Sequence, residues 1–333
     1  MGRMGELQVT VVVTARERFS AAIASLDNVL ATAGCPMRVI YMDAGSPRYV
    51  RDHLATRVKS HGIEVVSCRE YQAPNVLRNR ALAMVTTPYV AFIDNDIFCK
   101  DGWLERLVAC AGTTGATLVS PLICLGPPLH ENVHIMGGVC RIVDRGPGKR
   151  YITVKQGKQD IPVAQAEVPD APFQSEAVEY HTLLVRTEHF RKHGPLDENI
   201  LTFCEEVDLA LGVQATGGTT WIEPRSVITY EFPQAFAWSD IPWFFLRWSD
   251  RWLIQSISHL ESKWGADRSP AFDALVRGNG WMRRQLVFKP IAGLLPKGRV
   301  KDAIKGALRG IERALMGTWL ARRPAADRAD PPP

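Results

Sequence analysis

The stretch YVAFIDNDIF, Tyr89–Phe98, decides the fold of this chain. Its first five residues are apolar or aromatic, which is typical of a strand buried on both faces. Asp94, Asn95 and Asp96 follow directly, so a cluster of carboxylate and amide groups stands where the strand ends. Buried parallel strands belong to sheets that are covered by helices, and such sheets bind ligands beyond the carboxyl ends of their strands. The stretch therefore predicts an α/β fold with a ligand site at this strand end.

The sequence before this strand repeats the alternation of strand and helix. Strands are predicted at Val9–Thr14, Arg38–Met42 and Ile63–Ser67, and helices at Ser20–Ala33, Tyr49–Ser60 and Asn75–Met84. The alternation predicts a Rossmann-like, mostly parallel sheet with helices on both faces. Two further strand ends carry polar groups, Thr14-Ala15-Arg16 and Asp43. Because the carboxyl ends of parallel strands meet at one edge, we expect these side chains to lie near Asp94.

The second half of the chain is less regular. Helices are predicted at Gly102–Cys110 and Glu205–Ala215, and strands at Thr117–Leu122, Val139–Val143, Tyr151–Val154, Tyr180–Arg186, Thr219–Ile222 and Ser226–Tyr230. Residues 126–174 are rich in Gly, Pro and charge and are interpreted as a loop-rich insertion in one domain that covers 1–235. Residues 236–323 form a helical C-terminal extension in this prediction, and 324–333 a disordered tail.

Composition excludes several classes of protein. The hydrophobic content of 46% and the charged content of 23% are those of a globular chain. The seven cysteines are scattered without a C-x-x-C motif, which argues against a disulfide framework or a zinc site and favours a reducing compartment. The N-terminus has no signal-peptide pattern and no run of about 18 apolar residues occurs, so we expect a cytoplasmic location.

Charge is unevenly distributed. The chain has a net charge of +5, and the residues from Ile291 onward hold nine basic and four acidic side chains. Apolar residues recur at helical spacing between Val300 and Trp319, with Lys and Arg on the opposite side. This pattern predicts either a helix at 299–320 that binds an anionic membrane surface peripherally, or an ordinary C-terminal helix packed on its own domain. Because the positive charge lies in the tail, a nucleic-acid partner is not expected.

The pair Asp94 and Asp96 has the spacing of a site for a hard divalent cation. Carboxylates at a strand end hold Mg²⁺ or Mn²⁺, which can then bridge to diphosphate oxygens. The alternative is a turn in which Asp and Asn side chains bond their own backbone. Asp43 has the same two interpretations, since its carboxylate could accept a hydrogen bond from a uracil or a ribose, or simply close a turn.

A second acidic cluster begins the predicted helix Glu205–Ala215. Glu205, Glu206 and Asp208 lie within four residues, and acidic groups in a first helical turn complement the helix dipole. An acid beside a cleft also suits a general base that takes a proton from an attacking hydroxyl. Helical spacing puts Glu205 and Asp208 on similar faces and turns Glu206 away from both. One acid can therefore face a substrate while the others are structural.

Five sequence pieces in this order resemble the family 2 type of glycosyltransferase, which is inverting and has the A-type (GT-A) fold. The pieces are Thr14-Ala15-Arg16, Asp43-Ala44-Gly45-Ser46, Arg78-Asn79-Arg80-Ala81, Asp94-Asn95-Asp96, and Gly194-Pro195-Leu196-Asp197-Glu198 leading to Glu205-Glu206-Val207-Asp208-Leu209. The resemblance covers roughly residues 9–232. It implies that 1–235 form a catalytic domain that binds a nucleotide-sugar.

The resemblance also implies a role for each matching residue. The donor-binding residues would be Thr14, Ala15, Arg16, Asp43, Arg78, Asp94 and Asn95. The metal, Mn²⁺ or Mg²⁺, would be held by Asp94 and chiefly by Asp96. Glu206 matches the usual catalytic aspartate and would deprotonate the acceptor, with Glu205 and Asp208 on the acceptor side.

Two positions depart from the family pattern. The base is Glu206 rather than Asp, which is one methylene shorter, so the acceptor would sit slightly differently. Where the family often has a histidine metal ligand after the last strand, this chain has Tyr230-Glu231, and Glu231 is the expected substitute. His181 and His189 lie elsewhere and are interpreted as packing or surface residues.

The segment Arg247–Trp252 is similar to an Arg-Trp element that processive members of the family place over donor and acceptor. There an arginine could pair with the departing diphosphate. The alternative is an amphipathic helix whose tryptophans pack on the core. The sequence leaves the roles of Arg247 and Arg251 open.

The resemblance implies a non-processive transfer of one sugar, from a UDP-sugar by family tendency, to a glycan, a lipid-linked acceptor or a small molecule. One alternative is a nucleotidyltransferase, which would need a Gly-rich phosphate loop after the first strand, where Thr14–Arg18 has no glycine. Another is a non-catalytic nucleotide-sugar-binding module. The presence of Asp94, Asp96 and Glu206 together counts against that alternative.

Overall fold

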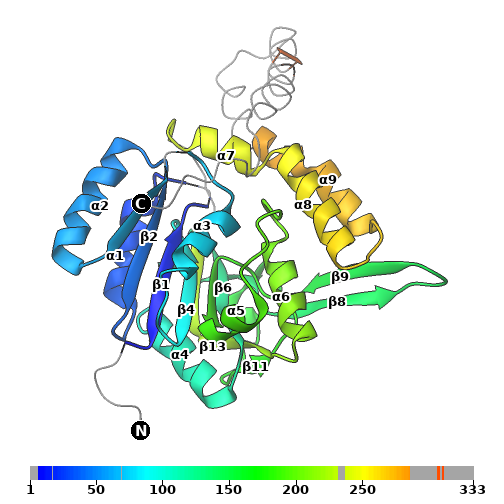
Figure 1. Cartoon of the computed structure of the whole chain (residues 1–333), viewed down its shortest axis with the longest axis horizontal. Coiled ribbons are helices and arrows are strands. Elements are labelled where there is room, and N and C mark those ends of the chain that lie inside the picture. The colour runs from blue at the N-terminus through cyan, green and yellow to red at the C-terminus, as the bar shows by residue number, and fades with distance from the viewer. Residues whose placement is uncertain are drawn as a thin grey trace.

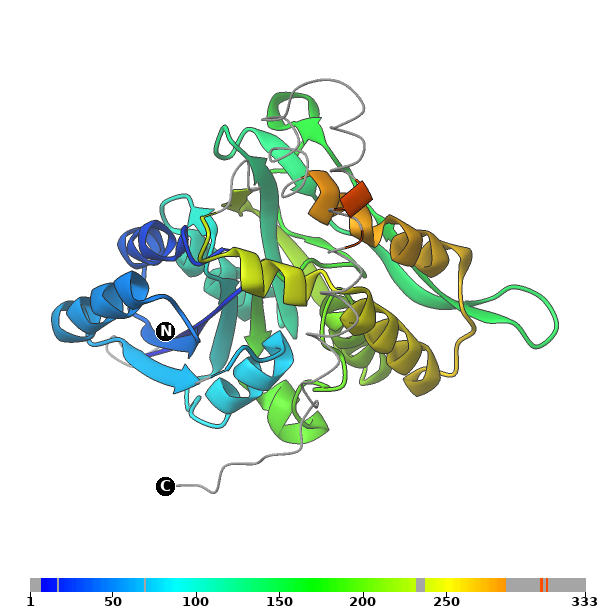
Figure 2. The same cartoon turned by 90° about the horizontal axis from the view of Figure 1, so that it is seen from above.

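The computed structural model describes residues 7–16, 18–68, 70–231 and 237–285, together with residues 306, 307 and 310. In this part of the chain an eleven-stranded mixed sheet lies at the centre, with helices on both sides (Figures 1 and 2). In sheet order the main path is β10 (Ile161–Pro162), β7 (Asn132–Ile135), β6 (Leu118–Gly126), β12 (Thr182–Arg186), β4 (Tyr89–Asp94), β1 (Val9–Thr14), β2 (Arg38–Ala44) and β3 (Glu64–Cys68).

The first half of the chain forms the parallel part of the sheet. Strand β1 pairs in parallel with β2 and β4, and β2 pairs in parallel with β3. Every residue of β1 and β4 is buried, which explains their continuous apolar runs. The register sets Thr14 directly opposite Asp94, so the ends of β1 and β4 lie side by side. The predicted parallel sheet and the meeting of these two strand ends are confirmed.

Strand β12 enters the sheet in the opposite direction. It runs antiparallel to β4 with Thr182 opposite Ile93, and the backbone N–H of Asp94 donates to the carbonyl of His181 at 3.1 Å. The residues just before β12 therefore lie beside the end of β4. A chain segment almost ninety residues downstream of Asp94 thus contributes to the same strand edge.

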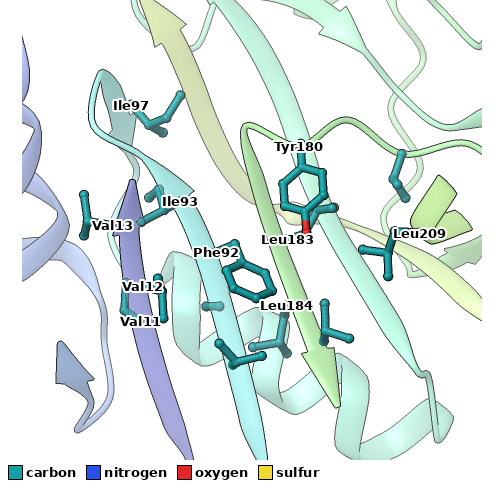
Figure 3. Close-up of a cluster of buried hydrophobic side chains, with 14 of the residues drawn as sticks. Val11, Val12, Val13, Phe92, Ile93, Ile97, Tyr180, Leu183, Leu184 and Leu209 are labelled. Atoms are coloured by element: carbon teal, nitrogen blue, oxygen red, sulfur yellow. The ribbon is translucent and has the colours of Figure 1, made fainter. Parts of the chain in front are cut away.

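The core between sheet and helices anchors this edge. Figure 3 shows Val12, Phe92, Leu184 and their neighbours in one buried cluster, which also includes Leu209 from helix α6 (Glu205–Ala215). Burying side chains of this size stabilises the packing by roughly 1.5–3 kcal/mol each. Because Leu209 fixes α6 in this core, the first turn of that helix is held in position relative to the sheet.

Most predicted elements are present with shifted ends. The helices of the first half are α1 (Ala22–Thr32), α2 (Arg48–His61), α3 (Pro74–Leu82) and α4 (Trp103–Thr114), and α6 has the predicted bounds. Strand β5 (Ile97–Cys99), strand β11 (Phe173–Gln174), the short 3₁₀ helix Val163–Gln165 and helix α5 (Thr187–His193) were not predicted. They are short, so their periodicity is too brief to detect.

The last strand of the sheet differs from its prediction. The two expected strands around Pro224 form one strand, β13 (Thr220–Glu231), which pairs in parallel with β6. The register shifts between Glu223 and Val227, so a bulge accommodates the proline that cannot donate to the ladder. The prediction of a break here was wrong because a bulge interrupts the pairing without ending the strand.

Residues 126–174 contain a hairpin of two strands, β8 (Gly138–Asp144) and β9 (Arg150–Gln156), which pair antiparallel as a separate sheet. In both views the hairpin extends well beyond the rest of the fold (Figures 1 and 2). Both strands were predicted two to four residues shorter than they are. The hairpin is the most projecting element of the described chain.

Three helices follow the sheet: α7 (Ile241–Arg247), α8 (Asp250–Lys263) and α9 (Pro270–Arg283). The side chains of Ser249 and Ser269 cap α8 and α9, each by accepting a backbone N–H. Among the residues that the structure describes, no helix has both the length and the apolar character needed to cross a bilayer. The predicted amphipathic helix at 299–320 and the tail at 324–333 lie outside the described residues, apart from three positions.

Candidate active site

The carboxylate of Asp94 is the centre of the site. Its side chain is 1% exposed, and three basic or imidazole groups approach it from three elements. Arg16 Nε and His181 Nδ1 each lie 3.2 Å from Oδ2, and Arg78 Nη2 lies 3.7 Å from Oδ1. Arg16 follows β1, Arg78 lies on α3, and His181 precedes β12. The sheet register therefore gathers at Asp94 residues that are widely separated in sequence.

Two of these neighbours continue to further acids. Arg16 Nη2 lies 3.5 Å from Glu179 Oε1, and His181 Nε2 lies 3.9 Å from the same oxygen. Arg16 and His181 thus both connect Asp94 to Glu179. The Arg78 guanidinium stacks over the Tyr180 ring at 3.6 Å from its centroid. Tyr180 fixes the plane of that guanidinium, which is favourable by cation–π attraction.

On the other side, Arg78 reaches the acidic start of α6. Its Nη1 atom lies 4.0 Å from Glu205 Oε1, and Arg247 Nη1 lies 3.7 Å from the same oxygen. Arg78, Glu205 and Arg247 are each 1% exposed. The result is a buried row of alternating charge, Arg247–Glu205–Arg78–Asp94. Such a row avoids leaving any one buried charge without an opposite charge nearby.

The other predicted donor-side residues mainly shape the loops. Asn95 Oδ1 accepts from the backbone N–H of Arg16 at 3.0 Å, and Asn95 Nδ2 donates to the carbonyl of Arg18 at 3.1 Å. Asp43 Oδ1 accepts from the backbone N–H of Ser46 at 2.8 Å, which is the turn interpretation for that oxygen. Ala15 and Asp43 are both buried at this edge. Asn95 therefore holds the loop that carries Arg16.

The three acids of α6 do not share one environment. Glu205 faces the arginines, whereas Asp208 binds the C-terminal helices: Oδ2 pairs with Lys263 Nζ at 2.8 Å, and Oδ1 accepts from Trp264 Nε1 at 2.8 Å. Glu206 is half-buried, and its charge interacts with Glu179 and Arg16. Asp208 thus serves to attach α8 to α6.

Burial and charge change the protonation of these groups. Burial raises the pKa of Asp94 to about 6, against the opposing effect of Arg16 and Arg78. Burial, and then the negative charges of Glu179 and Glu205, raise the pKa of Glu206 well above its usual value. Burial and then Arg16 lower the pKa of His181 well below 6.5, so its imidazole is neutral at pH 7. Glu206 therefore holds a proton more readily than an exposed glutamate does.

Glu231 lies apart from the Asp94 cluster. Its Oε2 atom accepts from Arg18 Nη2 at 2.6 Å, so it would have to release Arg18 to act as a metal ligand. The preceding Tyr230 stacks on the His181 ring with centroids 4.3 Å apart and planes 20° apart. His181 is therefore a packing residue, as expected, but it packs inside the site rather than away from it.

Sequence reasoning did not find Glu179 or His181 as site residues. They occupy no motif, and only the antiparallel pairing of β12 with β4 brings them beside Asp94. For Arg247 both interpretations hold in part. It is buried against Glu205 with its guanidinium 5.4 Å from the Phe203 ring, while nearby Trp252 packs edge-on against Trp243.

Unsatisfied polar atoms are concentrated at this edge. Five buried atoms have no hydrogen-bond partner among the described residues: Thr14 Oγ1, Arg78 Nε, Asp94 Oδ2, His181 Nδ1 and Glu205 Oε1. Buried polar groups are normally hydrogen-bonded, because leaving one unpaired costs roughly 1–3 kcal/mol. Five such atoms on connected residues are what a site for a polar ligand requires.

For a divalent metal, the residues offer oxygen ligands at one place. In the described part of the chain no group of three or more His, Cys, Asp and Glu side chains has the arrangement to hold a metal ion. Mg²⁺ and Mn²⁺ in phosphate-binding sites need only one or two carboxylates, because substrate phosphates and water complete the shell. Asp94 and Asp96, both buried at the end of β4, fit that smaller requirement.

Comparison with known proteins gives a consistent result. Residues 10–147 match the family "Glycosyl transferase family 2". Two curated relatives are pre-mycofactocin glycosyltransferases of Mycobacterium tuberculosis, from strains CDC 1551 / Oshkosh and ATCC 25618 / H37Rv. Each is 28% identical over 225 residues, which are 67% of this chain and 42% of the relative. The chain thus spans less than half the length of these relatives.

Two solved structures share the fold. GalNAc-T7 with UDP, GalNAc and Mn²⁺ has a TM-score of 0.52 at 11% identity, covering 88% of this chain and 59% of the other. The mannosyltransferase PcManGT from Pyrobaculum calidifontis, in complex with GDP-Man and Mn²⁺, has a TM-score of 0.51 at 14% identity, covering 96% and 84%. Sequence match and strand order agree: this chain is a member of glycosyltransferase family 2 with a GT-A fold.

Proposed function

We propose that this protein transfers one sugar from a nucleoside-diphosphate sugar to an acceptor hydroxyl, with inversion at the anomeric carbon. The observation that carries the proposal is the set of five connected buried polar atoms without hydrogen-bond partners, from Thr14 to Glu205. A nucleotide-sugar has the hydroxyl, phosphate and base groups that such atoms can bind. The set lies between the loops expected to hold the donor and the first turn of α6.

The donor would lie along the ends of β1, β2 and β4. In this proposal Thr14, Ala15, Arg16, Asp43 and Arg78 line the nucleoside side. The resemblance of the chain favours a UDP-sugar. The solved relatives were bound to UDP in one case and to GDP-Man in the other, so the nucleotide must be measured.

Asp94 and Asp96 would hold a divalent cation, Mn²⁺ or Mg²⁺. Their carboxylates are hard oxygen ligands, and the Asp94 oxygen Oδ2 has no hydrogen-bond partner among the described residues. When bound, the cation supplies positive charge for the diphosphate that leaves. The arginines at 16, 78 and 247 add fixed positive charge at the same edge, which further favours an anionic ligand.

Glu206 would act as the general base. It removes the proton from the acceptor hydroxyl as the acceptor oxygen bonds to the anomeric carbon and the bond from that carbon to the diphosphate breaks. The electron pair of the broken bond goes to the diphosphate, and the proton stays on Glu206. Its raised pKa suits this step, because a stronger base has a larger driving force for taking the proton. Glu205, on the acceptor side in this proposal, keeps Arg78 and Arg247 in place.

In this proposal residues 1–235 form the catalytic domain, and the helices that follow support it. The acceptor is a glycan, a lipid-linked sugar or a small molecule, and the protein acts in the cytoplasm. These parts of the proposal follow from the family resemblance. The donor site can be tested without knowing the acceptor.

The test is a thermal-shift screen of UDP-, GDP-, CMP- and dTDP-sugars, each with and without Mn²⁺. A ligand that binds the folded state stabilises it in proportion to the logarithm of its excess over Kd. We expect one nucleotide class to raise Tm, and to raise it more when Mn²⁺ is present. Slow hydrolysis of that donor would then separate an enzyme from a non-catalytic binding module. The absence of a shift with all four nucleotide classes would overturn the proposal.

A further inference from the structure

The β8–β9 hairpin carries more positive charge than any role in the proposed reaction requires. Residues 138–156 contain five basic side chains and a single acidic one, Asp144. The hairpin extends away from the sheet and helices in two perpendicular views (Figures 1 and 2). An isolated two-stranded hairpin is marginally stable in water, so its position depends on attachment to the rest of the fold.

The base of the hairpin is firmly attached. Gln214 on α6 donates to the carbonyl of Cys140 at 2.9 Å, and Glu176 accepts from the backbone N–H of Cys140 at 3.2 Å. Cys140 and Ile152 are buried in the main core. The link between α8 and α9 contributes as well, since Asp267 accepts from the backbone N–H of Arg150 at 2.9 Å. The hairpin is therefore held as an extended arm.

Two of the five basic side chains are neutralised by neighbours. Arg141 Nε donates to Glu176 at 2.8 Å, and Arg150 Nε lies 3.5 Å from Asp144. The other three, Arg145, Lys149 and Lys155, are exposed. None of the three makes an ion pair with any residue in the described ranges.

The outer face of the hairpin is amphipathic. Side chains alternate along each strand, and Val143 lies opposite Tyr151 on the face away from buried Cys140 and Ile152. Val143 and Tyr151 are half-buried and lie directly below the turn that Arg145 and Lys149 flank. An apolar pair with a tyrosine hydroxyl, surrounded by exposed cations, matches the composition of the interfacial zone of a bilayer.

Basic residues on exposed strands can have a simpler purpose. Lysine and arginine on edge strands prevent pairing with strands of other molecules. That purpose accounts for Lys155, which lies within β9. It does not account for Arg145 and Lys149, because they flank the turn Gly146-Pro147-Gly148 and extend no ladder.

We propose that the tip of the β8–β9 hairpin docks on an anionic lipid surface through Arg145, Lys149 and Lys155, with Tyr151 entering the headgroup region. Each basic side chain near such a surface adds electrostatic attraction that salt weakens. Because α6 carries Glu206 and also holds the hairpin through Gln214, docking would bring the site close to the lipid surface. The docking itself is independent of the proposed function and can be measured without donor or acceptor.

The experiment is sedimentation of the full chain with vesicles of phosphatidylcholine, or of phosphatidylcholine with 30% phosphatidylglycerol added as the anionic probe, at low and high salt. We expect binding only to the anionic vesicles, and less of it at high salt. The variant with Arg145→Glu, Lys149→Glu and Lys155→Glu should lower the partition coefficient by about a hundredfold, since each basic contact is lost and reversed. The variant Tyr151→Ser should weaken it less.

A control variant matches the change in charge at a distance from the hairpin. Lys59→Glu, Arg191→Glu and Lys192→Glu alter three exposed cations on α2 and α5 and should leave vesicle binding within about twofold of the wild type. Far-UV circular dichroism and Tm establish that both triple variants are folded. Two results would overturn the proposal: equal loss of binding in both triple variants, or full binding by the hairpin variant. The second would assign vesicle binding to another part of the chain and edge protection to the hairpin cations.

Discussion

His181 Nδ1 lies 3.2 Å from Asp94 Oδ2, although 87 residues separate them in the sequence. The contact exists because β12 pairs antiparallel with β4, so the residue before one strand meets the last residue of the other. The imidazole also stacks on Tyr230 from β13. Three strands therefore fix the position of the carboxylate around which the site is built.

His181→Phe should weaken donor binding. The substitution keeps an aromatic ring for Tyr230 but removes the nitrogen beside Asp94, which leaves a buried charge with one polar neighbour fewer. A loss of roughly 1–3 kcal/mol is expected in donor affinity or in the free energy of unfolding. Calorimetric titration with the donor and urea unfolding measure the two. His189→Phe, a half-buried position on α5, is the control and should leave donor affinity unchanged.

Asp96→Asn should abolish the part of the donor-induced Tm shift that depends on Mn²⁺. The substitution keeps the size of the side chain but removes the negative charge that a hard cation requires. The Mn²⁺ electron paramagnetic resonance signal gives an independent readout, because bound and free ions differ in their spectra. Asp101→Asn alters an exposed aspartate five residues away and should change neither measurement. Normal Mn²⁺ binding by Asp96→Asn would contradict the proposed ligand role.

Glu206→Gln should leave donor binding intact and reduce kcat by roughly 100- to 10,000-fold, the usual contribution of a general base. Glu206→Asp is the informative partner variant, because it restores a carboxylate at a shorter reach and should recover part of the rate. Steady-state kinetics with thermal shift separate the chemical step from binding. If Glu206→Gln were fully active, another group would have to accept the proton.

The pH dependence of kcat/KM should change in the variant Glu179→Gln. Glu206 must be deprotonated to act as a base, so the rate falls as the pH drops through its raised pKa. Burial, Glu179 and Glu205 raise the pKa of Glu206, while Arg16 lowers it. Removal of the Glu179 charge therefore lowers the pKa of Glu206, and the acidic limb of the profile moves to lower pH. Glu176→Gln, near the hairpin base, should leave the position of the limb unchanged.

Asp208→Ala should affect stability rather than chemistry. Its carboxylate binds both Lys263 and the Trp264 indole N–H, so its loss leaves a buried donor unpaired. We expect the free energy of unfolding in urea to fall by about 1–3 kcal/mol, with donor affinity retained. A large fall in kcat at unchanged stability would instead place Asp208 in contact with the acceptor.

Much of the fold could be predicted because its signals are local. The β-branched run at β1 and the acidic first turn of α6 predicted the bounds of both elements, since strand and helix periodicities are properties of short windows. The meeting of Thr14 and Asp94 followed from one rule about parallel strands. Loop residues such as Asn95 were placed in the site but not in their supporting role.

The rest of the site depends on pairing between distant segments. Glu179 and His181 precede a strand whose direction and neighbour leave no trace in nearby residues. Arg247 looked like one face of an amphipathic helix, because only the short break at Trp248 and Ser249 between α7 and α8 allows it to reach Glu205. Side chains that function through such long-range contacts require a three-dimensional structure to be found.

The indole N–H of Trp243 donates to the carbonyl of Arg16, so a helix near the end of the described chain supports a loop from its beginning. During synthesis, a ribosome completes the sheet well before α7 leaves the exit tunnel. The Arg16 loop therefore gains this support only after about 240 residues have been translated. A protein shortened to its first 235 residues would keep every motif of the family and still lack part of what holds them in place.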